Sequence, residues 1–169
     1  MVQIGSAPAT LDSPIEHLVA CHRRIEQRLD TLVNAADHFA LDRDTAMRAI
    51  RASTQFLDTN GVWHTEDEEA SLFPRLRPKL AAEELDFIGT LKSQHQQAES
   101  IYAELKTLIA GLETSTGPVS AYRACADRLR TLYLAHIQSE DELLTSIARR
   151  SLNATELADI SREMRSRRS

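Results

Sequence analysis

The chain has 169 residues, with 25 Asp or Glu against 20 Lys or Arg and a formal net charge of −5. This length suits one domain with its own core, and the acidic balance argues against a nucleic-acid partner, which would favour a basic chain. No run reaches the roughly 18 apolar residues of a membrane span, and residues 1–14 lack the basic and apolar regions of a signal peptide. Two cysteines without a CxxC motif favour a reducing compartment, so we expect a cytoplasmic protein without a membrane partner.

The first predicted helix begins at Pro14, after a short segment that carries no helical pattern. Residues 1–12 are therefore expected to be disordered. Ser13, Pro14 and Glu16 form a capping-box pattern in which the proline takes the first helical position. Apolar residues then recur at spacings of three and four to about residue 38, which is typical of an amphipathic helix.

Three more long helices and one short helix are predicted downstream. The second runs from about residue 42 to the Pro74/Pro78 region, the third from about 81 to 111, and the fourth, after a turn cluster at 114–118, to about 150. Asn153 and Glu156 cap a short fifth helix with an Arg-rich end. Long helices with short loops predict an all-α, up-down-up-down antiparallel four-helix bundle over residues 13–151. Residues 152–169 would add a short C-terminal helix and an Arg-rich tail, which we interpret as a solvated helix end.

Each long helix carries one histidine on its apolar face. At 100° per residue, each of these histidines lies within about 60° of several apolar side chains on its own helix. The inward-facing set is His22, His64, His95 and His136. His17 and His38 lie about 140° and 160° away from His22, so these two are expected on the outer surface.

Three of the four inward histidines have a glutamate four residues later, on the same helical face. The pairs are His64 with Glu68, His95 with Glu99, and His136 with Glu140. Nearby acids point at least about 120° away from the histidine of their own helix and are interpreted as solvated charge. These are Glu66, Glu69, Asp141 and Glu142, whereas the direction of Asp67 is ambiguous.

The four histidines are also predicted to meet at one height in the bundle. His64 and His95 each lie about 14 residues from the turn between them, and His95 and His136 each lie about 18 residues from the next turn. Because the rise per residue is constant, equal separations on both sides of a turn bring the chain back to the same height. A single core histidine is usually only a hydrogen-bonded packing residue, but burying this whole set without a metal would cost several kcal/mol. Four imidazoles and three carboxylates exceed the needs of one tetrahedral zinc and suit two iron or manganese ions.

The segments around these residues resemble hemerythrin-like proteins with the HHE cation-binding domain, over about residues 14–150. The matching segments, in order, are LVACHRRIEQRL, WHTEDEEASLFPRL, SQHQQAE and YLAHIQSEDELL. The resemblance implies a four-helix bundle with two non-haem iron ions, a bridging oxo or hydroxo group, and an open position for a small molecule. It assigns His22 and His64 to one iron, His95, Glu99 and His136 to the other, and Glu68 and Glu140 as bridges. Manganese or zinc would act as substitutes.

The chain departs from the oxygen-carrying members of that family at two positions. Those carriers have a second histidine on the third helix where this chain has Glu99, and an aspartate five residues after the last histidine, where this chain has Glu140 at four. An extra anionic ligand stabilises the ferric state, which favours redox chemistry, sensing or scavenging over reversible carriage. The expected ligand is O₂, NO or peroxide, and the alternatives are a di-iron oxidoreductase with peroxidase- or NO-reductase-like activity and an iron-responsive or iron-storage module.

Overall fold

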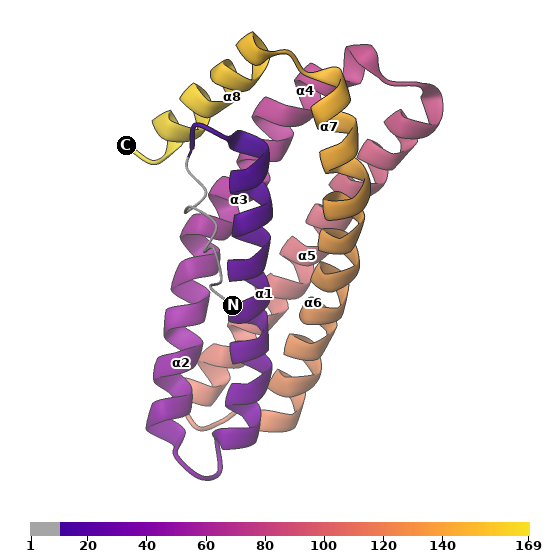
Figure 1. The fold of residues 1–169 in the computed structure, drawn as a ribbon. Coiled ribbons are helices and arrows are strands. Elements are labelled where there is room, and N and C mark those ends of the chain that lie inside the picture. The colour runs from indigo at the N-terminus through magenta and orange to yellow at the C-terminus, as the bar shows by residue number, and fades with distance from the viewer. Residues whose placement is uncertain (1–10) are drawn as a thin grey trace, which may run out of the picture.

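The computed structural model describes residues 11–169 and shows a helical protein (Figure 1). Within this part of the chain the helices follow one another with short breaks, and no strand is present. The predicted all-α class is confirmed. No helix among the described residues is at once long and apolar enough to cross a membrane. The expectation of disorder for residues 1–12 concerns mainly residues 1–10, which lie outside the described residues.

Five helical stretches make up the fold, and two of them contain π-helical turns. The first, third and fifth are α1 (Pro14–His38), α5 (Ala82–Glu113) and α8 (Ala154–Arg167). The second joins α2 (Arg43–Phe56), the π-helix η1 (Leu57–Gly61), α3 (Val62–Glu66), the π-helix η2 (Asp67–Leu72), α4 (Phe73–Leu76) and the 3₁₀ turn η3 (Arg77–Lys79). The fourth joins α6 (Val119–Ser139), the π-helix η4 (Glu140–Leu144) and α7 (Thr145–Ser151). The five stretches agree with the predicted helices to within a few residues, but the π-helical turns were not predicted.

Local capping explains several of the helix ends. Pro14 occupies the first turn of α1 as expected, but the Ser13 side chain makes no capping hydrogen bond, so the predicted box does not form there. At α8 the box does form. Asn153 Oδ1 accepts from the Glu156 amide at 3.0 Å, and Glu156 Oε2 accepts from the Asn153 amide at 2.9 Å. Asp42 caps α2 with a single bond of this kind, because its Oδ1 accepts from the Thr45 amide at 3.0 Å.

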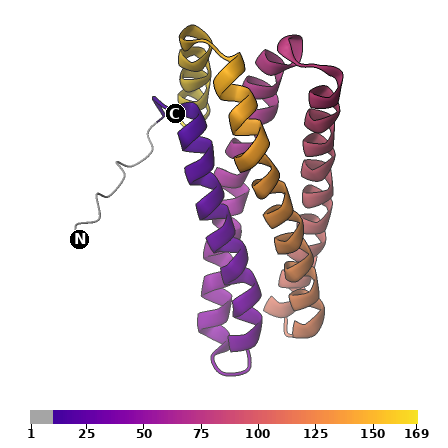
Figure 2. The same cartoon turned by 45° about the vertical axis from the view of Figure 1, so that its right-hand side comes forward.

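The long helical stretches run along the length of the molecule, with the turns at 39–42 and 114–118 at its lower end (Figure 1). Helix α1 packs against α2 and α6, and α6 packs against α5, an arrangement that Figure 2 shows from a second side. The turn between α5 and α6 needs glycine, because a Cβ on Gly117 would lie 3.1 Å from the carbonyl carbon of Gly111. Helix α8 lies across the upper end, in contact with α1 and η2.

Two apolar clusters fill the interior, one at each end. The lower cluster comes from α1, α2, η1, α5 and α6 and includes Ile25, Leu32, Ile50, Leu105 and Tyr122. The upper cluster comes from the C-terminal ends of the second and fourth stretches, the starts of α1 and α5, and α8, and includes Leu18, Leu72, Leu76, Leu91 and Ile160. On every long helical stretch, buried polar residues lie between the residues of the upper cluster and those of the lower cluster. The fold therefore places a polar layer between two apolar ends.

The C-terminal arginines are part of this fold, which corrects their interpretation as a solvated helix end. Arg167 and Arg168 reach the fully buried carboxylate of Asp67 in η2, at 2.8 and 2.6 Å. Arg165 pairs with Asp12, and only the exposed Arg162 stays on its own helix, with Asp159.

Candidate metal site

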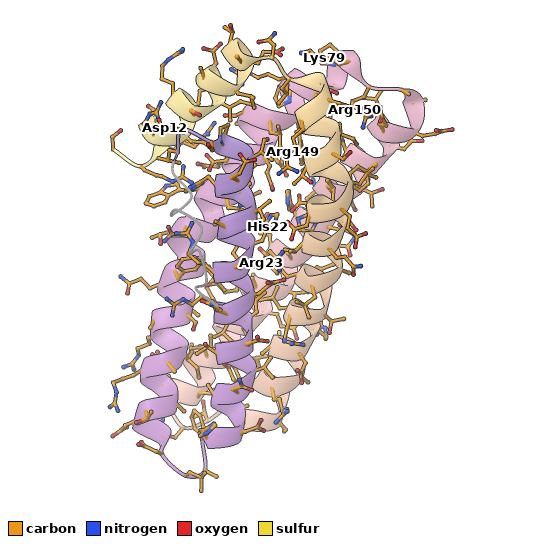
Figure 3. All side chains as sticks on the ribbon, in the orientation of Figure 1. Asp12, His22, Arg23, Lys79, Arg149 and Arg150 are labelled. Atoms are coloured by element: carbon orange, nitrogen blue, oxygen red, sulfur yellow. The ribbon has the colours of Figure 1, made fainter. Side chains whose placement is uncertain are left out.

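Six polar side chains from the long helical stretches converge in the polar layer. They are His22 on α1, His64 on α3, Glu68 in η2, His95 on α5, His136 on α6 and Glu140 in η4. All six are buried, and the two glutamates are fully inaccessible to solvent. Figure 3 locates His22 on α1, above the lower turns and below α8. Both glutamates belong to π-helical turns, a rare backbone form that occurs often at functional sites.

The six residues form two groups of candidate ligand atoms that share both carboxylates. One group is His22, His64, Glu68 and Glu140, and the other is His95, His136, Glu68 and Glu140. Within each group the ligand atoms lie within 4.8 Å of one another. In this arrangement each histidine pair could bind one ion, and the two shared carboxylates could bridge both ions.

The Glu68 carboxylate divides its two oxygens between the histidine pairs. Its Oε1 lies 3.4 Å from His64 Nε2 and 3.9 Å from His22 Nε2, whereas its Oε2 lies 3.4 Å from His95 Nε2. Neighbouring ligands of an octahedral ion with bonds of about 2.1 Å stand roughly 3 Å apart. The spacings at Glu68 are close to this value, so a cation could be held on each side with little rearrangement.

The Glu140 carboxylate joins the same two pairs through one oxygen. Its Oε2 lies 3.2 Å from His22 Nε2 and 3.2 Å from His136 Nε2. The Nε2 atoms of His95 and His136 face each other at 3.0 Å. All four imidazoles therefore turn Nε2 toward the two carboxylates.

The opposite ring nitrogens of three histidines are held by hydrogen bonds. His22 Nδ1 lies 2.7 Å from Asp141 Oδ1, His95 Nδ1 lies 2.9 Å from Glu69 Oε1, and His136 Nδ1 lies 2.9 Å from Gln94 Oε1. An oxygen acceptor at Nδ1 keeps the proton there and leaves the lone pair on Nε2, as in the outer shells of metal sites. His64 Nδ1 has no hydrogen-bond partner among the described residues.

Several inward atoms are left without hydrogen bonds. In the described part of the chain, neither oxygen of Glu68 or Glu140 has a hydrogen-bond partner, nor has His22 Nε2. Their near polar neighbours are one another, as imidazole and carboxylate groups 3.2 to 3.9 Å apart, although buried carboxylate oxygens usually accept well-formed hydrogen bonds. A set of unsatisfied nitrogen and oxygen donors aimed at common points fits metal cations.

The charges of the metal-free site are balanced by protons. Burial disfavours the charged form of both His22 and His95. At His22 the carboxylates of Glu140 and Glu68 outweigh this effect and raise the pKa to about 9. At His95 the carboxylate of Glu68 does the same and also raises the pKa to about 9. Burial lowers the pKa of His64 to about 4. The imidazoles around the buried carboxyl of Glu68, His64 first, hold its pKa well below the usual range. Two protonated imidazoles thus face two carboxylates near pH 7, in places that cations could take.

Two cavities adjoin the site. A small one of about 10 Å³, room for roughly one water, lies beside His22, Glu68 and Glu140, and its other walls are mostly apolar side chains of the upper cluster. A larger pocket of about 790 Å³ opens between the η1–α3–η2 region and α5, and His95 and Tyr133 form part of its wall. The site therefore has a tight apolar side and a wider, open side lined by both polar and apolar residues.

The structure does not bring the seventh predicted ligand, Glu99, into either group. Glu99 is exposed and lines the larger pocket, one turn beyond His95. The two glutamates that reach the site lie in π-helical turns, whereas α5 is α-helical throughout, so the same four-residue spacing gives different directions. Of the two histidines expected outside, His38 is exposed and His17 is half-buried.

Sequence reasoning missed the side chains that hold the histidine rings. Asp141 and Glu69 were interpreted as solvated because each points away from the histidine of its own helix. In the structure each contacts a histidine of another helix, His22 and His95 respectively. The sequence did offer one indication. Asp141 and Glu69 directly follow Glu140 and Glu68, and a residue next to an inward-facing one points to the side, toward a neighbouring helix.

Comparison with protein families gives an independent result. The family model of the hemerythrin HHE cation-binding domain matches residues 13–148. The chain belongs to this family. Comparison with curated proteins found no significant match. The matched range contains all six converging residues and ends before α8, so α8 lies outside the part of the chain that the family model covers.

Proposed function

We propose that this hemerythrin-domain protein holds two non-haem iron ions inside an up-down-up-down antiparallel four-helix bundle. His22 and His64 would bind one ion, His95 and His136 the other, and Glu68 and Glu140 both. When bound, such a pair supplies an open coordination position and redox equivalents for O₂, NO or peroxide. We infer a role in sensing, scavenging or redox chemistry with such a small ligand.

The observation that carries this proposal is the sharing of two buried carboxylates by two histidine pairs. A single zinc site would need only four ligands and leave the others buried without a partner. Nitrogen and oxygen donors without thiolate suit iron or manganese. The histidine rings are already oriented by Asp141, Glu69 and Gln94, so the ligand atoms need little reordering.

The small cavity supports a small ligand. Its volume of about 10 Å³ leaves room for roughly one water-sized molecule next to Glu68 and Glu140. Ile15, Leu18 and Leu72 are among its walls and offer no hydrogen bonds, which suits an uncharged diatomic molecule better than a polar organic one.

Metal analysis of two matched histidine variants tests the site. After anaerobic reconstitution, wild-type protein should contain about two iron ions per chain, and His64→Ala should lose at least one. The control is His38→Ala, because His38 is exposed and, within residues 11–169, its ring hydrogen bonds only to the Asn34 carbonyl. Retention of both ions by His64→Ala, or less than one ion in the wild type, would contradict the assignment.

A second candidate is an oxidoreductase acting on peroxide or NO, and the larger pocket favours it. Tyr133 lines that pocket beside His95, and its ring meets the His136 ring edge-on at 6.2 Å. Burial raises the pKa of Tyr133 to about 12, so its hydroxyl keeps its proton and can donate it to a hydrogen bond.

Optical spectra of the iron-loaded protein, recorded without and then with oxygen, separate the two candidates. A band that appears with oxygen and disappears on its removal supports a sensor or scavenger. Irreversible oxidation with turnover of added peroxide, weakened in Tyr133→Phe, supports the enzyme. Iron release on oxidation without either result would favour an iron-responsive or storage module.

A further inference from the structure

The C-terminal arginines contact the residues that directly precede two proposed metal ligands. Arg167 and Arg168 bind Asp67, which precedes Glu68. The Arg168 guanidinium also lies over the ring of Trp63, which precedes His64, at 5.5 Å from its centroid. Both contacts fall on the junction between α3 and the π-helix η2.

The contact at Asp67 is a buried charge cluster. Asp67 is fully buried, and its two oxygens accept from Arg167 Nη1 at 2.8 Å and from Arg168 Nη2 at 2.6 Å and Nη1 at 3.3 Å. Both arginine side chains are themselves more than four-fifths buried. Removing the arginines would leave an uncompensated buried carboxylate, which would have to take up a proton or move with its backbone toward solvent.

A further hydrogen bond ties the same arginine to the next turn. Arg167 Nη2 donates to Ser71 Oγ at 2.6 Å. The two arginines therefore contact positions 63, 67 and 71, on both sides of Glu68. Since a π-helical turn is an uncommon backbone form, side-chain contacts of this kind fix the direction in which its side chains point.

Helix α8 is anchored along the same stretch by two other ion pairs. Arg75 in α4 donates to both oxygens of Glu163 at 2.7 and 3.1 Å, and Lys79 contacts Glu156 at 2.6 Å. Ile160 and Met164 are buried in the upper cluster. The arginines are thus presented by a docked helix that lies beyond the residues matched by the hemerythrin domain.

We propose that Asp67, Arg167 and Arg168 position Glu68 and His64, so that docking of α8 and binding of metal stabilise each other. The proposal rests on the proposed metal site. Because both events fix the same helical turn, thermodynamic linkage requires that the effect on the equilibria be reciprocal: the docked helix tightens metal binding, and bound metal stabilises the docked helix. Weaker binding is expected to show mainly as faster metal release.

Metal release tests one direction of this coupling. Anaerobically Fe(II)-loaded Arg167→Gln/Arg168→Gln protein should release iron to an excess of chelator roughly tenfold faster than wild type, the lower range for outer-shell contacts. The charge-matched control is Arg149→Gln/Arg162→Gln at the same end, since both residues make exposed ion pairs. A control that is destabilised elsewhere is Tyr122→Phe, which weakens the lower cluster and leaves α8 untouched. Both controls should release iron at the wild-type rate.

Hydrogen exchange of the wild-type protein tests the other direction without any mutation. Amides of residues 154–167 should exchange more slowly in the Fe(II)-loaded protein than in the metal-free protein, whereas residues 43–56 in α2 should change much less. Release from the double variant at the wild-type rate, or equal exchange of α8 with and without metal, would overturn the positioning role alone. Wild-type protein that binds no iron would overturn both this role and the proposed function.

Discussion

The two ends of the molecule are stabilised in different ways. At the lower end, four helical stretches bury an apolar cluster whose surrounding ion pairs, such as Arg130 with Asp30, are exposed. At the upper end, the apolar cluster is completed by α8, and buried or half-buried charges at Asp67 and Arg75 join the pieces. The stabilisation from apolar burial does not require a particular partner residue, whereas a buried charge is stabilised only when an opposite charge accompanies it. We therefore expect the lower end to act as a scaffold, and the upper end to be more sensitive to salt and to changes in the adjoining polar layer.

The largest expected effect comes from truncating one leucine in each cluster. Leu105 and Leu76 are both fully buried, so Leu105→Ala and Leu76→Ala should each cost about 2–5 kcal/mol in the free energy of unfolding of the metal-free protein. With iron bound, the cost of Leu105→Ala should be unchanged. That of Leu76→Ala should grow, because α4 continues the helix that carries Glu68 and its distortion weakens metal binding.

Urea unfolding with and without Fe(II) measures both costs. Equal behaviour of the two variants in the presence of iron would contradict the difference between the two ends.

A pH titration of the metal-free protein should give the next largest effect. Protonated His22 and His95 have pKa values raised to about 9, so their stabilising contribution is complete below pH 6.5 and is lost as the pH rises through about 9. His64, with its pKa lowered to about 4, acts in the opposite sense and weakens the fold as the pH falls below 6.5. Stability should therefore peak near pH 6.5 and fall by several kcal/mol by pH 9.5.

Thermal unfolding from pH 5 to 9.5 would follow this curve. His38→Gln should keep the wild-type profile, since His38 is exposed. A flat profile between pH 6.5 and 9.5 would mean that the polar layer does not hold the two protons.

A smaller loss of stability is expected from removing a buried hydroxyl that makes a hydrogen bond within the lower cluster. The fully buried Tyr122 donates its hydroxyl to the Leu32 carbonyl at 2.7 Å, from α6 to α1. Tyr122→Phe should cost about 1 kcal/mol of unfolding free energy. The loss should be the same at low and high salt and with or without iron. A loss that depended on iron would show that the lower end is coupled to the site.

The smallest effects are expected from removing one ion pair at each end, and the two losses of stability should differ. Arg130→Gln removes an exposed pair with Asp30 and should cost at most about 0.5 kcal/mol. Arg75→Gln should cost more, because Arg75 makes two hydrogen bonds to Glu163 and one to the Ser71 carbonyl. Urea unfolding in 0.05 M and 1 M NaCl compares them, and equal costs would contradict the distinction.

The helices and the choice of histidines could be predicted because they depend on local rules. Pro14 and the Asn153–Glu156 pair mark helix starts through backbone chemistry alone, and the apolar period assigns His22, His64, His95 and His136 to inward faces. These features need no knowledge of which helices are neighbours.

The remaining features depend on contacts between helices. Glu68, Glu99 and Glu140 share one spacing from a histidine, and only the π-helical turns, which tertiary packing stabilises, separate those that reach the site from the one that does not. Asp141 and Glu69 find their histidines across helix boundaries. Asp67 meets its arginines 100 residues away. An angle measured within one helix contains no information about such partners.

The turn at 39–42 offers an engineering opportunity. Leu41 at this turn is 83% exposed, and the turn lies at the end of the molecule opposite α8 (Figure 1). Exposed loop tips of this kind tolerate insertion of a whole folded domain. A fluorescent protein inserted there should label the chain without disturbing the polar layer, because the insertion lies at the end that we expect to be insensitive to metal.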